Sequence, residues 1–229
     1  QQRFPGIVLR GYGRKSSGLQ MVSDGKSILC DVQTSGDEAM IYALKVPQAV
    51  VIVSEDREAG IAAAKEAGCD CVFLDDGYGK HHIKKYEIVI AVDTPNRFCL
   101  PAGPYRERLW PGKTVKLVKE GREFERQVSV IDAAESMALV TAIARPERLD
   151  RYLPPVVSKH YFADHHFFSK AELEAVLTQS GAEKLLVTYK DYVKIRSFNL
   201  PLALLELELR LDPALSNAVE NYIRTYDEN

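Results

Sequence analysis

Residues 71–77, Cys71-Val72-Phe73-Leu74-Asp75-Asp76-Gly77, form an apolar run that ends in two adjacent carboxylates. An apolar run of this length predicts a buried strand. Adjacent acidic side chains repel each other, so a purely structural strand gains nothing from ending in them. Nucleotide-binding α/β proteins use strand-end carboxylates to hold Mg²⁺ next to phosphates. The stretch therefore predicts an α/β fold and the acidic half of a phosphoryl-transfer site.

The phosphate loop that usually accompanies such a strand, G-x-x-x-x-G-K-[ST], does not occur in residues 1–229. Gly112-Lys113-Thr114 has the right ending, but Glu107 occupies the position of the first glycine, five residues before Gly112. The chain begins at Gln1 rather than at methionine, so we expect the gene to encode a preceding segment that carries this loop. We accordingly expect residues 1–229 alone to be inactive as a phosphotransferase.

Composition limits the class of protein. A chain of 229 residues with 46% hydrophobic side chains can bury the core of one large or two small domains. The formal net charge of −2 argues against a surface devoted to nucleic acid, so no nucleic-acid partner is expected. No apolar run reaches about 18 residues, and no signal peptide is visible. The four cysteines include no C-x-x-C pair, which is typical of reduced thiols in a cytoplasmic protein.

Strand and helix patterns alternate along the chain. In the first part, strands are predicted at 7–9, 49–53, 71–74 and 88–92, and helices at 37–44 and 57–67. In the last part, strands are predicted at 139–142, 156–161, 185–187 and 202–209, and helices at 146–152, 170–177 and 213–226. This order predicts a mostly parallel sheet with helices on both faces and a second, smaller α/β lobe. The predicted division is a core domain at 1–108, a hinge or β-ribbon at 109–136, and the second lobe at 137–229.

Several polar segments fall where such sheets place their active sites, at the carboxyl ends of strands. Each segment taken singly also has a simpler explanation. Asp37-Glu38 suits the start of a helix, and Arg106-Glu107 suits an exposed ion pair. His165-His166 is a weak metal signal, because two imidazoles do not fill a zinc shell. The basic run 80–85 suits a solvated loop.

Taken in order, eight motifs resemble the tetraacyldisaccharide 4'-kinase family from about residue 7 to residue 195. They are RGYGRK (10–15), GDE (36–38), SEDR (54–57), LDDG (74–77), LPAGPYRE (100–107), ARPER (144–148), FADHH (162–166) and TYKD (188–191). The resemblance implies a P-loop-type α/β core with a second lobe. It also implies an enzyme of lipid A biosynthesis in Gram-negative bacteria. Such an enzyme transfers the γ-phosphate of ATP to the 4'-hydroxyl of an acylated disaccharide 1-phosphate glycolipid. The protein would then contact the cytoplasmic face of the inner membrane peripherally.

The resemblance also assigns roles to residues. Asp37 with His165 would remove the proton of the attacking hydroxyl, and Arg106 would act beside them as a catalytic residue. Asp75 and Glu38 would hold Mg²⁺. The remaining assignments are to ATP and to the acceptor. The residues implied for ATP are Arg57, Asp76 and Glu107, and those implied for the glycolipid are Arg10, Tyr12, Lys80 and His81.

The chain departs from the family pattern at three places. Gly79-Lys80-His81 replaces a glutamine-histidine-arginine stretch, Ala39 replaces a proline, and residues 109–136 do not match the family strand expected there. A second hypothesis therefore stays open, a diverged non-catalytic homologue that binds glycolipid or a partner protein. A third, an unrelated nucleotide-binding domain, would leave the Asp-His and Arg-Glu motifs without a role.

Overall fold

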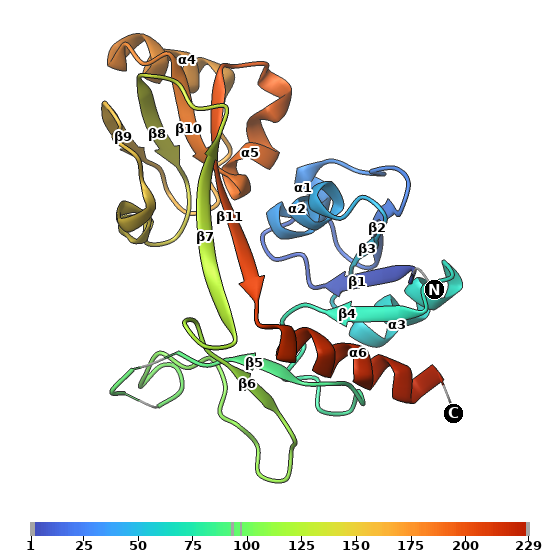
Figure 1. The fold of residues 1–229 in the computed structure, drawn as a ribbon. Helices are drawn as coiled ribbons and strands as arrows, with labels where there is room; N and C mark the ends of the chain where they lie inside the picture. Colours follow the sequence, from blue (N-terminus) through green and yellow to red (C-terminus); the bar gives the residue numbers. More distant parts are fainter. Residues whose placement is uncertain (1–2, 93, 97, 228–229) are drawn as a thin grey trace. The chain divides into compact units, whose positions relative to one another are not determined.

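The structure is a computed structural model that describes residues 3–92, 94–96 and 98–227 (Figure 1). By packing, the chain forms two compact units. The larger contains Gln1–Asp75 and Val128–Leu207, and the smaller contains Asp76–Gln127 and Glu208–Asn229. These limits differ from the predicted division at 1–108, 109–136 and 137–229, because both predicted α/β lobes contribute to the larger unit. The predicted hinge segment lies mostly in the smaller unit.

The first sheet of the larger unit has the strand order β2-β3-β1-β4. Its strands are β1 (Pro5–Leu9), β2 (Gln20–Asp24), β3 (Val50–Val53) and β4 (Cys71–Leu74). β1 pairs in parallel with β3 and β4, as predicted, whereas β2 pairs antiparallel with β3 at the edge. The sequence pattern missed β2, because its polar ends Gln20 and Asp24 flank only three less polar residues.

Helices cover both faces of this sheet. Ile7 and Leu9 of β1 pack in the cluster that contains Ala39 and Ala43 of α2 (Asp37–Lys45), next to the short α1 (Val32–Ser35). Val8 points to the other face and packs with Ala64 of α3 (Arg57–Glu66). Successive side chains of a strand alternate between faces, so one central strand anchors both layers. The predicted helices at 37–44 and 57–67 are confirmed.

The second sheet has the order β7-β11-β10-β8-β9. Its strands are β7 (Phe124–Ile131), β8 (Met137–Thr141), β9 (Ser158–Tyr161), β10 (Lys184–Thr188) and β11 (Leu202–Leu211). β10 pairs in parallel with β8 and β11, and β8 pairs in parallel with β9. One face packs against α4 (Lys170–Ser180) through its buried Leu173 and Val176. The turn from β10 leads directly into α5 (Tyr189–Ile195).

Three predicted elements of the chain were wrong in detail. Residues 109–136 do not form a β-ribbon. β6 (Lys116–Val118) instead pairs in parallel with β5 (Ile88–Ile90), and β7 joins β11. The predicted strand 88–92 therefore does not belong to the first sheet. The predicted helix at 146–152 is the 3₁₀ helix η1 (Pro146–Tyr152), and a second 3₁₀ turn, η2 (Arg196–Phe198), follows α5.

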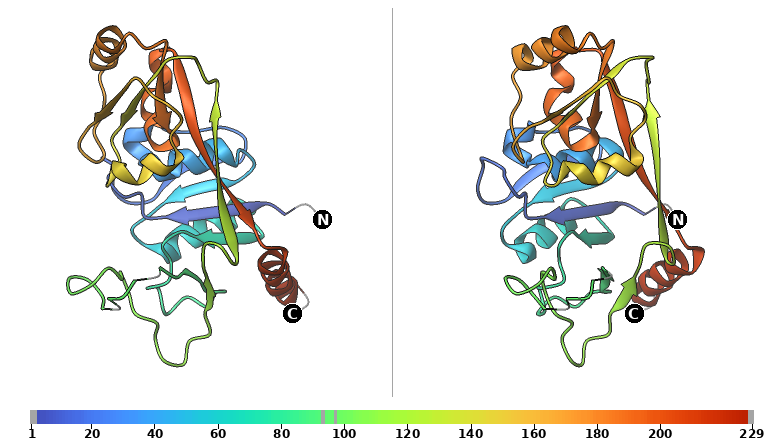
Figure 2. Two further views of the ribbon diagram at one scale, coloured as in Figure 1. Left: turned by 60° about the vertical axis from the view of Figure 1, so that its left-hand side comes forward. Right: turned by 90° about the vertical axis from the view of Figure 1, so that its left-hand side faces the viewer.

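The strands β7 and β11 run side by side in every view and continue from one unit into the other (Figure 2). Their far ends lie in the smaller unit, which also holds β5, β6 and α6 (Pro213–Asp227). A small apolar cluster of Val118, Phe124 and Leu215 gives this unit a core of its own. Each unit therefore contains a segment of both strands.

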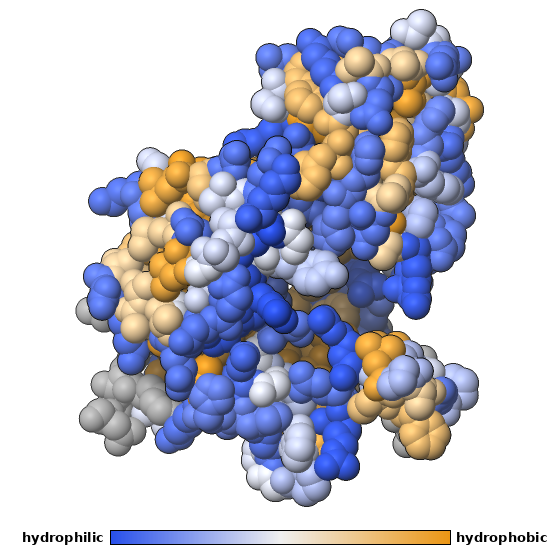
Figure 3. Space-filling view, turned by 180° about the vertical axis from the view of Figure 1, so that it is seen from behind, coloured by the Kyte–Doolittle hydropathy of each residue, from blue (hydrophilic) through white to orange (hydrophobic). Residues whose placement is uncertain are grey.

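The surface carries apolar side chains among hydrophilic ones. On the face drawn in Figure 3, apolar residues form separate patches within a mostly hydrophilic surface. Across the described part of the chain, no helix combines the length and apolar character that crossing a membrane requires.

The four cysteines are free thiols, as the sequence predicted.

Candidate active site

The first component of the site is the start of α2. Gly36 precedes the helix with φ +82° and ψ 160°, a conformation that residues with a side chain rarely adopt. A Cβ at Gly36 would lie 3.0 Å from the carbonyl oxygen of Tyr12 in the loop after β1. Asp37 is thus the first residue of the helix, as the simpler interpretation of this carboxylate also predicted, and Gly36 is the N-cap. Its side chain is only 5% exposed.

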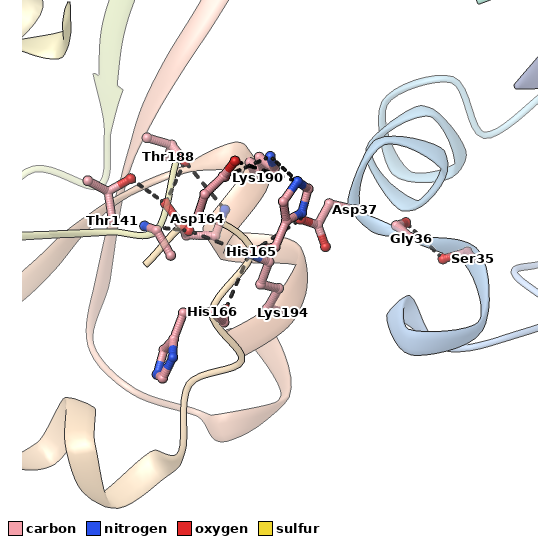
Figure 4. A network of polar contacts seen from close by, with 12 residues as sticks. Ser35, Gly36, Asp37, Thr141, Asp164, His165, His166, Thr188, Lys190 and Lys194 are labelled. Carbon is pink, nitrogen blue, oxygen red and sulfur yellow. Dashed lines mark hydrogen bonds and ion pairs between the residues drawn. The ribbon is translucent and has the colours of Figure 1, made fainter. Parts of the chain in front are cut away.

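The structure brings Asp37 and His165 together, although they are 128 positions apart in the sequence (Figure 4). Nδ1 of His165 lies 3.1 Å from Oδ2 of Asp37. His165 follows β9 in a loop, where its φ of +61° and the hydrogen bond from its N–H to the carbonyl of Ala142 (3.1 Å) direct the ring. An imidazole whose Nδ1 faces a carboxylate keeps Nε2 for a proton that arrives or leaves.

The other imidazole nitrogen faces a second polar group. Nε2 of His165 lies 3.4 Å from Nζ of Lys190 and 3.8 Å from Oδ2 of Asp164. The ring of Tyr12 lies at 5.5 Å between centroids. Charged and aromatic groups from the first β-strand loop, the loop after β9 and α5 therefore surround this one histidine.

A buried lysine contacts the same carboxylate. Nζ of Lys194 lies 3.3 Å from Oδ2 of Asp37 and 3.9 Å from Oδ1 of Asp191. Asp191 itself accepts hydrogen bonds from the hydroxyls of Thr141 and Thr188, each at 2.7 Å, and from the N–H of Ala142 at 3.1 Å. Burial raises the pKa of Asp191, while these hydrogen bonds act in the opposite direction.

Lys194 lies outside the eight sequence motifs, and Lys190 and Asp191 belong to the TYKD motif without a predicted role. A signal was present: Lys194 follows Lys190 by four residues and lies between apolar Val193 and Ile195. A lysine within such an apolar run on a short helix needs a buried carboxylate as its partner.

A second group of acidic side chains lies where β4 ends. Asp75 follows β4, and its backbone N–H donates to the carbonyl of Val8 at 3.1 Å. Burial, and then the negative charge of Asp75, raise the pKa of Glu38 on α2. Burial and the same carboxylate raise the pKa of Tyr42 to about 12. Glu38 and Tyr42 are four residues apart, so one face of α2 is directed toward Asp75.

This arrangement provides oxygen ligands of the kind that Mg²⁺ prefers. Within the described residues, no group of three or more histidine, cysteine, aspartate or glutamate side chains is already arranged around a metal position. Mg²⁺ at nucleotide sites typically uses one or two carboxylates together with water and phosphate oxygens. Two mutually repelling carboxylates, Glu38 and Asp75, match that donor set, because a cation offsets the repulsion.

Arg57, which the resemblance assigns to ATP, is buried at the same edge of the sheet. Its guanidinium donates to the carbonyl of Ser54 at 2.7 Å and to the carbonyl of Asp75 at 3.2 Å. These two bonds join the ends of β3 and β4. Arg57 therefore has a structural role next to Asp75, and its contact with ATP stays a prediction.

The two residues of the β1 loop that the resemblance assigns to the glycolipid are accessible. Arg10 is exposed, and Tyr12 is 69% exposed. Arg14 in the same loop is enclosed instead, and its guanidinium bonds to the carbonyl of Gly18 at 2.6 Å and to the carboxylate of Glu55. The enclosed arginine holds the loop while its neighbours remain open to a ligand.

The remaining predicted site residues belong to the smaller unit. Nη2 of Arg106 lies 3.1 Å from Oδ2 of Asp76, with side chains that are 76% and 64% exposed. An ion pair this exposed contributes about 0–1 kcal/mol to stability. Glu107 packs against Gly79 so closely that a Cβ there would meet its Oε1 at 2.6 Å.

Lys80 and His81 lie in the same unit. The carbonyl of Lys80 accepts a hydrogen bond from Nζ of Lys85 at 2.7 Å. The ring of His81 packs edge-on against Tyr78 and Trp110, at centroid distances of 5.6 and 5.0 Å. The exposed imidazole is thus held by aromatic neighbours rather than by an acidic partner in this contact.

The family model of LpxK, tetraacyldisaccharide-1-P 4'-kinase, matches residues 1–130 and 118–224. The chain belongs to this family. A tetraacyldisaccharide 4'-kinase of Helicobacter pylori (strain HPAG1) is 44% identical over 227 residues, which cover 97% of this chain and 72% of the relative. The Campylobacter jejuni enzyme of the same name (serotype O:23/36) is 39% identical over 225 residues, or 97% and 73% of the two chains. The predicted family membership is confirmed, and the family is one of kinases.

The fold matches a solved structure as well. A crystal structure of LpxK from Aquifex aeolicus in complex with ATP superposes with a TM-score of 0.70 at 20% sequence identity. The match covers 96% of this chain and 78% of that one. The predicted α/β class, with parallel-rich sheets and helices, is therefore confirmed.

Proposed function

We propose that this LpxK-family protein transfers the γ-phosphate of ATP to the 4'-hydroxyl of a tetraacylated disaccharide 1-phosphate. The observation that carries the proposal is the contact between Asp37 at the start of α2 and His165 in the loop after β9, 3.1 Å apart. A buried carboxylate beside an imidazole is a suitable device for removing a hydroxyl proton as the oxygen attacks phosphorus. The names of the 39–44% identical relatives supply the acceptor.

Asp37 and His165 would act as one unit in this reaction. The sugar hydroxyl loses its proton to the pair while its oxygen forms the new bond to the γ-phosphorus. The bond between that phosphorus and the β,γ-bridging oxygen of ATP breaks, and ADP leaves. Lys190 next to Nε2 of His165 and Tyr12 next to its ring would limit the orientations of the imidazole.

Asp75 and Glu38 would hold Mg²⁺. Bound there, the ion would neutralise charge on the phosphates. Arg106 would stabilise charge that develops on the transferred phosphoryl group, and Asp76, Arg57 and Glu107 would support the nucleotide. Support for these roles is their match to the family motifs LDDG, SEDR and LPAGPYRE.

The residues that the family resemblance implies for the acceptor are Arg10, Tyr12, Lys80 and His81. Arg10 and Tyr12 are open to a ligand, and Lys80 and His81 offer positive charge and hydrogen-bond donors to an anionic headgroup. A substrate with acyl chains resides in a membrane, so we propose that the protein acts peripherally at the cytoplasmic face of the inner membrane.

The test is transfer of label from [γ-³²P]ATP to the purified disaccharide 1-phosphate by the complete gene product. We expect turnover that depends on Mg²⁺ and a labelled phosphate at the 4' position. Asp75→Asn should lower turnover about 100-fold or more, because a charged group is lost next to the phosphates. Asp31→Asn is the matched control, since Asp31 caps α1 through Thr34 and asparagine caps equally well. A protein that binds the glycolipid without any turnover would overturn the proposal.

One observation favours a second candidate, a non-catalytic protein that binds glycolipid or a partner protein. Residues 1–229 contain no G-x-x-x-x-G-K-[ST] loop, whose amides and lysine carry much of the binding to the β- and γ-phosphates. We therefore propose that residues 1–229 alone do not turn over. The same assay on this fragment separates the candidates, because only the kinase hypothesis predicts activity for the complete gene product and none for the fragment.

A further inference from the structure

Lys194 is a charged residue in the interior of the larger unit. Its side chain is 1% exposed, and its ammonium lies among the carboxylates of Asp37 and Asp191 and the carbonyl of His166 (Figure 4). An ammonium so far from water is tolerated only where carboxylates and acceptors replace its hydration shell. The two carboxylates and the carbonyl around Lys194 therefore suit a positively charged group.

The two carboxylates beside Lys194 differ in their own partners. Asp191 accepts two hydroxyl hydrogen bonds and one backbone hydrogen bond, from Thr141, Thr188 and Ala142. These three groups fix Asp191 to the ends of β8 and β10 without the lysine. The closer contact of the lysine is with Asp37, at 3.3 Å against 3.9 Å for Asp191.

One oxygen of Asp37 makes the contacts with His165 and with Lys194. Oδ2 faces Nδ1 of His165 at 3.1 Å and Nζ of Lys194 at 3.3 Å. Two donors on one oxygen determine the plane of a carboxylate, and therefore the direction in which its other oxygen points. The lysine belongs to α5 and the aspartate to α2, two helices that pack against each other.

Lys190, one turn earlier on α5, makes the corresponding contact with the histidine. Its Nζ lies 3.4 Å from Nε2 of His165, and its side chain is 23% exposed. Residues four apart share a helix face, so α5 presents one lysine to each member of the Asp37–His165 pair. Lys194 is the enclosed member of these two.

We propose that Lys194 is a positioning residue for the phosphoryl transfer: its buried ammonium orients the carboxylate of Asp37 toward His165 and toward the attacking hydroxyl. The inference rests on the proposed kinase function, and it adds a residue to which the family resemblance assigned no role. Lys194 itself does not touch the reacting atoms. Its effect passes through Asp37.

The test compares Lys194→Met with Lys194→Met/Asp191→Asn. Methionine keeps an unbranched apolar chain without the charge. The second substitution removes one of the two carboxylates left without the ammonium, and asparagine can still hydrogen-bond to Thr141, Thr188 and Ala142. Lys170→Met is the control, because Lys170 forms an exposed ion pair with Glu174 on α4. All three variants are made in the complete gene product.

Three quantities are measured for each variant: the melting temperature, kcat and KM for the disaccharide 1-phosphate, and the ¹⁵N resonances of the His165 ring in the ligand-free protein. We expect the single variant to be less stable and the double variant to recover stability. In both variants kcat should fall about 100-fold, the loss typical of a catalytic group displaced by about 1 Å. KM should change much less, and the Nδ1 resonance of His165 should shift. Lys170→Met should match the wild type.

A double variant that recovers kcat together with stability would overturn the proposal, because Lys194 would then serve the fold alone. An Nδ1 resonance of His165 that stays at its wild-type position in both variants would also overturn it. Absence of turnover in the wild-type protein would instead contradict the proposed function. The ¹⁵N measurement does not depend on turnover, so it still decides whether Lys194 orients the Asp37–His165 pair.

Discussion

Single ionisable residues in this site are enclosed by α2 and α5 and are almost fully removed from water. Asp37 and Lys194 are 5% and 1% exposed and lie within ion-pair distance of each other. Glu38, the next residue on α2, has a different environment, because burial and the negative charge of Asp75 raise its pKa. An ionised carboxylate with a raised pKa lowers the free energy of unfolding at neutral pH. A bound cation offsets this loss, because it attracts the ionised form.

This pKa shift predicts the pH dependence of one variant. The native pKa of Glu38 lies above its unfolded value, so between the two the native state holds more protons than the unfolded state. The free energy of unfolding therefore falls as pH rises through the native pKa. We expect Glu38→Gln to be more stable than wild type at neutral pH in EDTA, and this gain to vanish below the ordinary glutamate range. Thermal unfolding at the two pH values measures it.

Glu58→Gln is the control for this prediction, since Glu58 also lies in the first turn of a helix but is exposed to solvent. A Glu38→Gln protein that melts below wild type at neutral pH would contradict the assignment. So would a gain that persists unchanged in acid.

At the scale of elements, local sequence and tertiary packing together determine where α2 begins. The pattern Gly36-Asp37-Glu38 predicted where the helix begins, and the structure begins it at Asp37. The φ of +82° at Gly36 and the close carbonyl of Tyr12 explain why a glycine precedes it. The position of Asp37 thus depends on a backbone conformation that only glycine adopts easily.

Gly36→Ala should therefore affect stability and activity together. A side chain at this φ and ψ costs about 1–3 kcal/mol, and the Cβ would meet the Tyr12 oxygen at 3.0 Å. We expect chemical denaturation to show this loss and kcat to fall, because Asp37 moves with its helix. Gly18→Ala separates the two effects: Gly18 has φ +69° with open space around its Cβ, so it should lose stability through φ alone and keep kcat. Equal kcat in wild type and Gly36→Ala would show that the start of α2 does not position the site.

The sequence predicted an element more accurately where its hydrophobic pattern was clear. Buried strands such as β3, with four consecutive apolar residues, were identified to within one residue. The edge strand β2 was missed because its apolar run is short. Its pairing with β3 depends on the tertiary structure and cannot be read from the local sequence. Residues 109–136 were expected to form a hinge or a β-ribbon. The β-ribbon does not form, since β6 pairs with β5 and β7 with β11, and local sequence does not reveal these pairings.

At the scale of the whole molecule, the larger unit is joined across its two sheets by contacts of α2. Asp37 at the start of the helix contacts His165 and Lys194, and Lys45 at its end forms an ion pair with Glu206 of β11. Glu206 is 7% exposed, and the Lys45 ammonium also lies 4.6 Å from the centroid of the Tyr189 ring. Polar contacts at both ends of α2 thus hold the two sheets together.

Sequence could predict both sheets but not these contacts. Asp37 and His165 were proposed as partners through the family motifs, whereas Lys194 and Glu206 gave no motif of their own. Lys194 is enclosed where α5 packs on α2, and Glu206 of β11 pairs with Lys45 of α2. Packing between segments so distant in sequence leaves no periodic signal.

The Lys45–Glu206 pair predicts a coupled loss of stability. Lys45→Met should cost about 1–3 kcal/mol, because it leaves a buried carboxylate without its partner. Glu206→Gln should lessen that cost in the double variant. A double-mutant cycle by chemical denaturation measures the coupling. Strictly additive losses would show that the pair does not join α2 to β11.

The most direct test of the account is the coupling between Asp37 and His165 in catalysis. In the complete gene product, Asp37→Ala and His165→Ala should each lower kcat strongly. The double variant should be little worse than the poorer single variant, since residues that act as one unit are not additive. A wild-type kcat for His165→Ala, or strictly additive losses in the double variant, would contradict the claim that the pair removes the proton of the attacking hydroxyl.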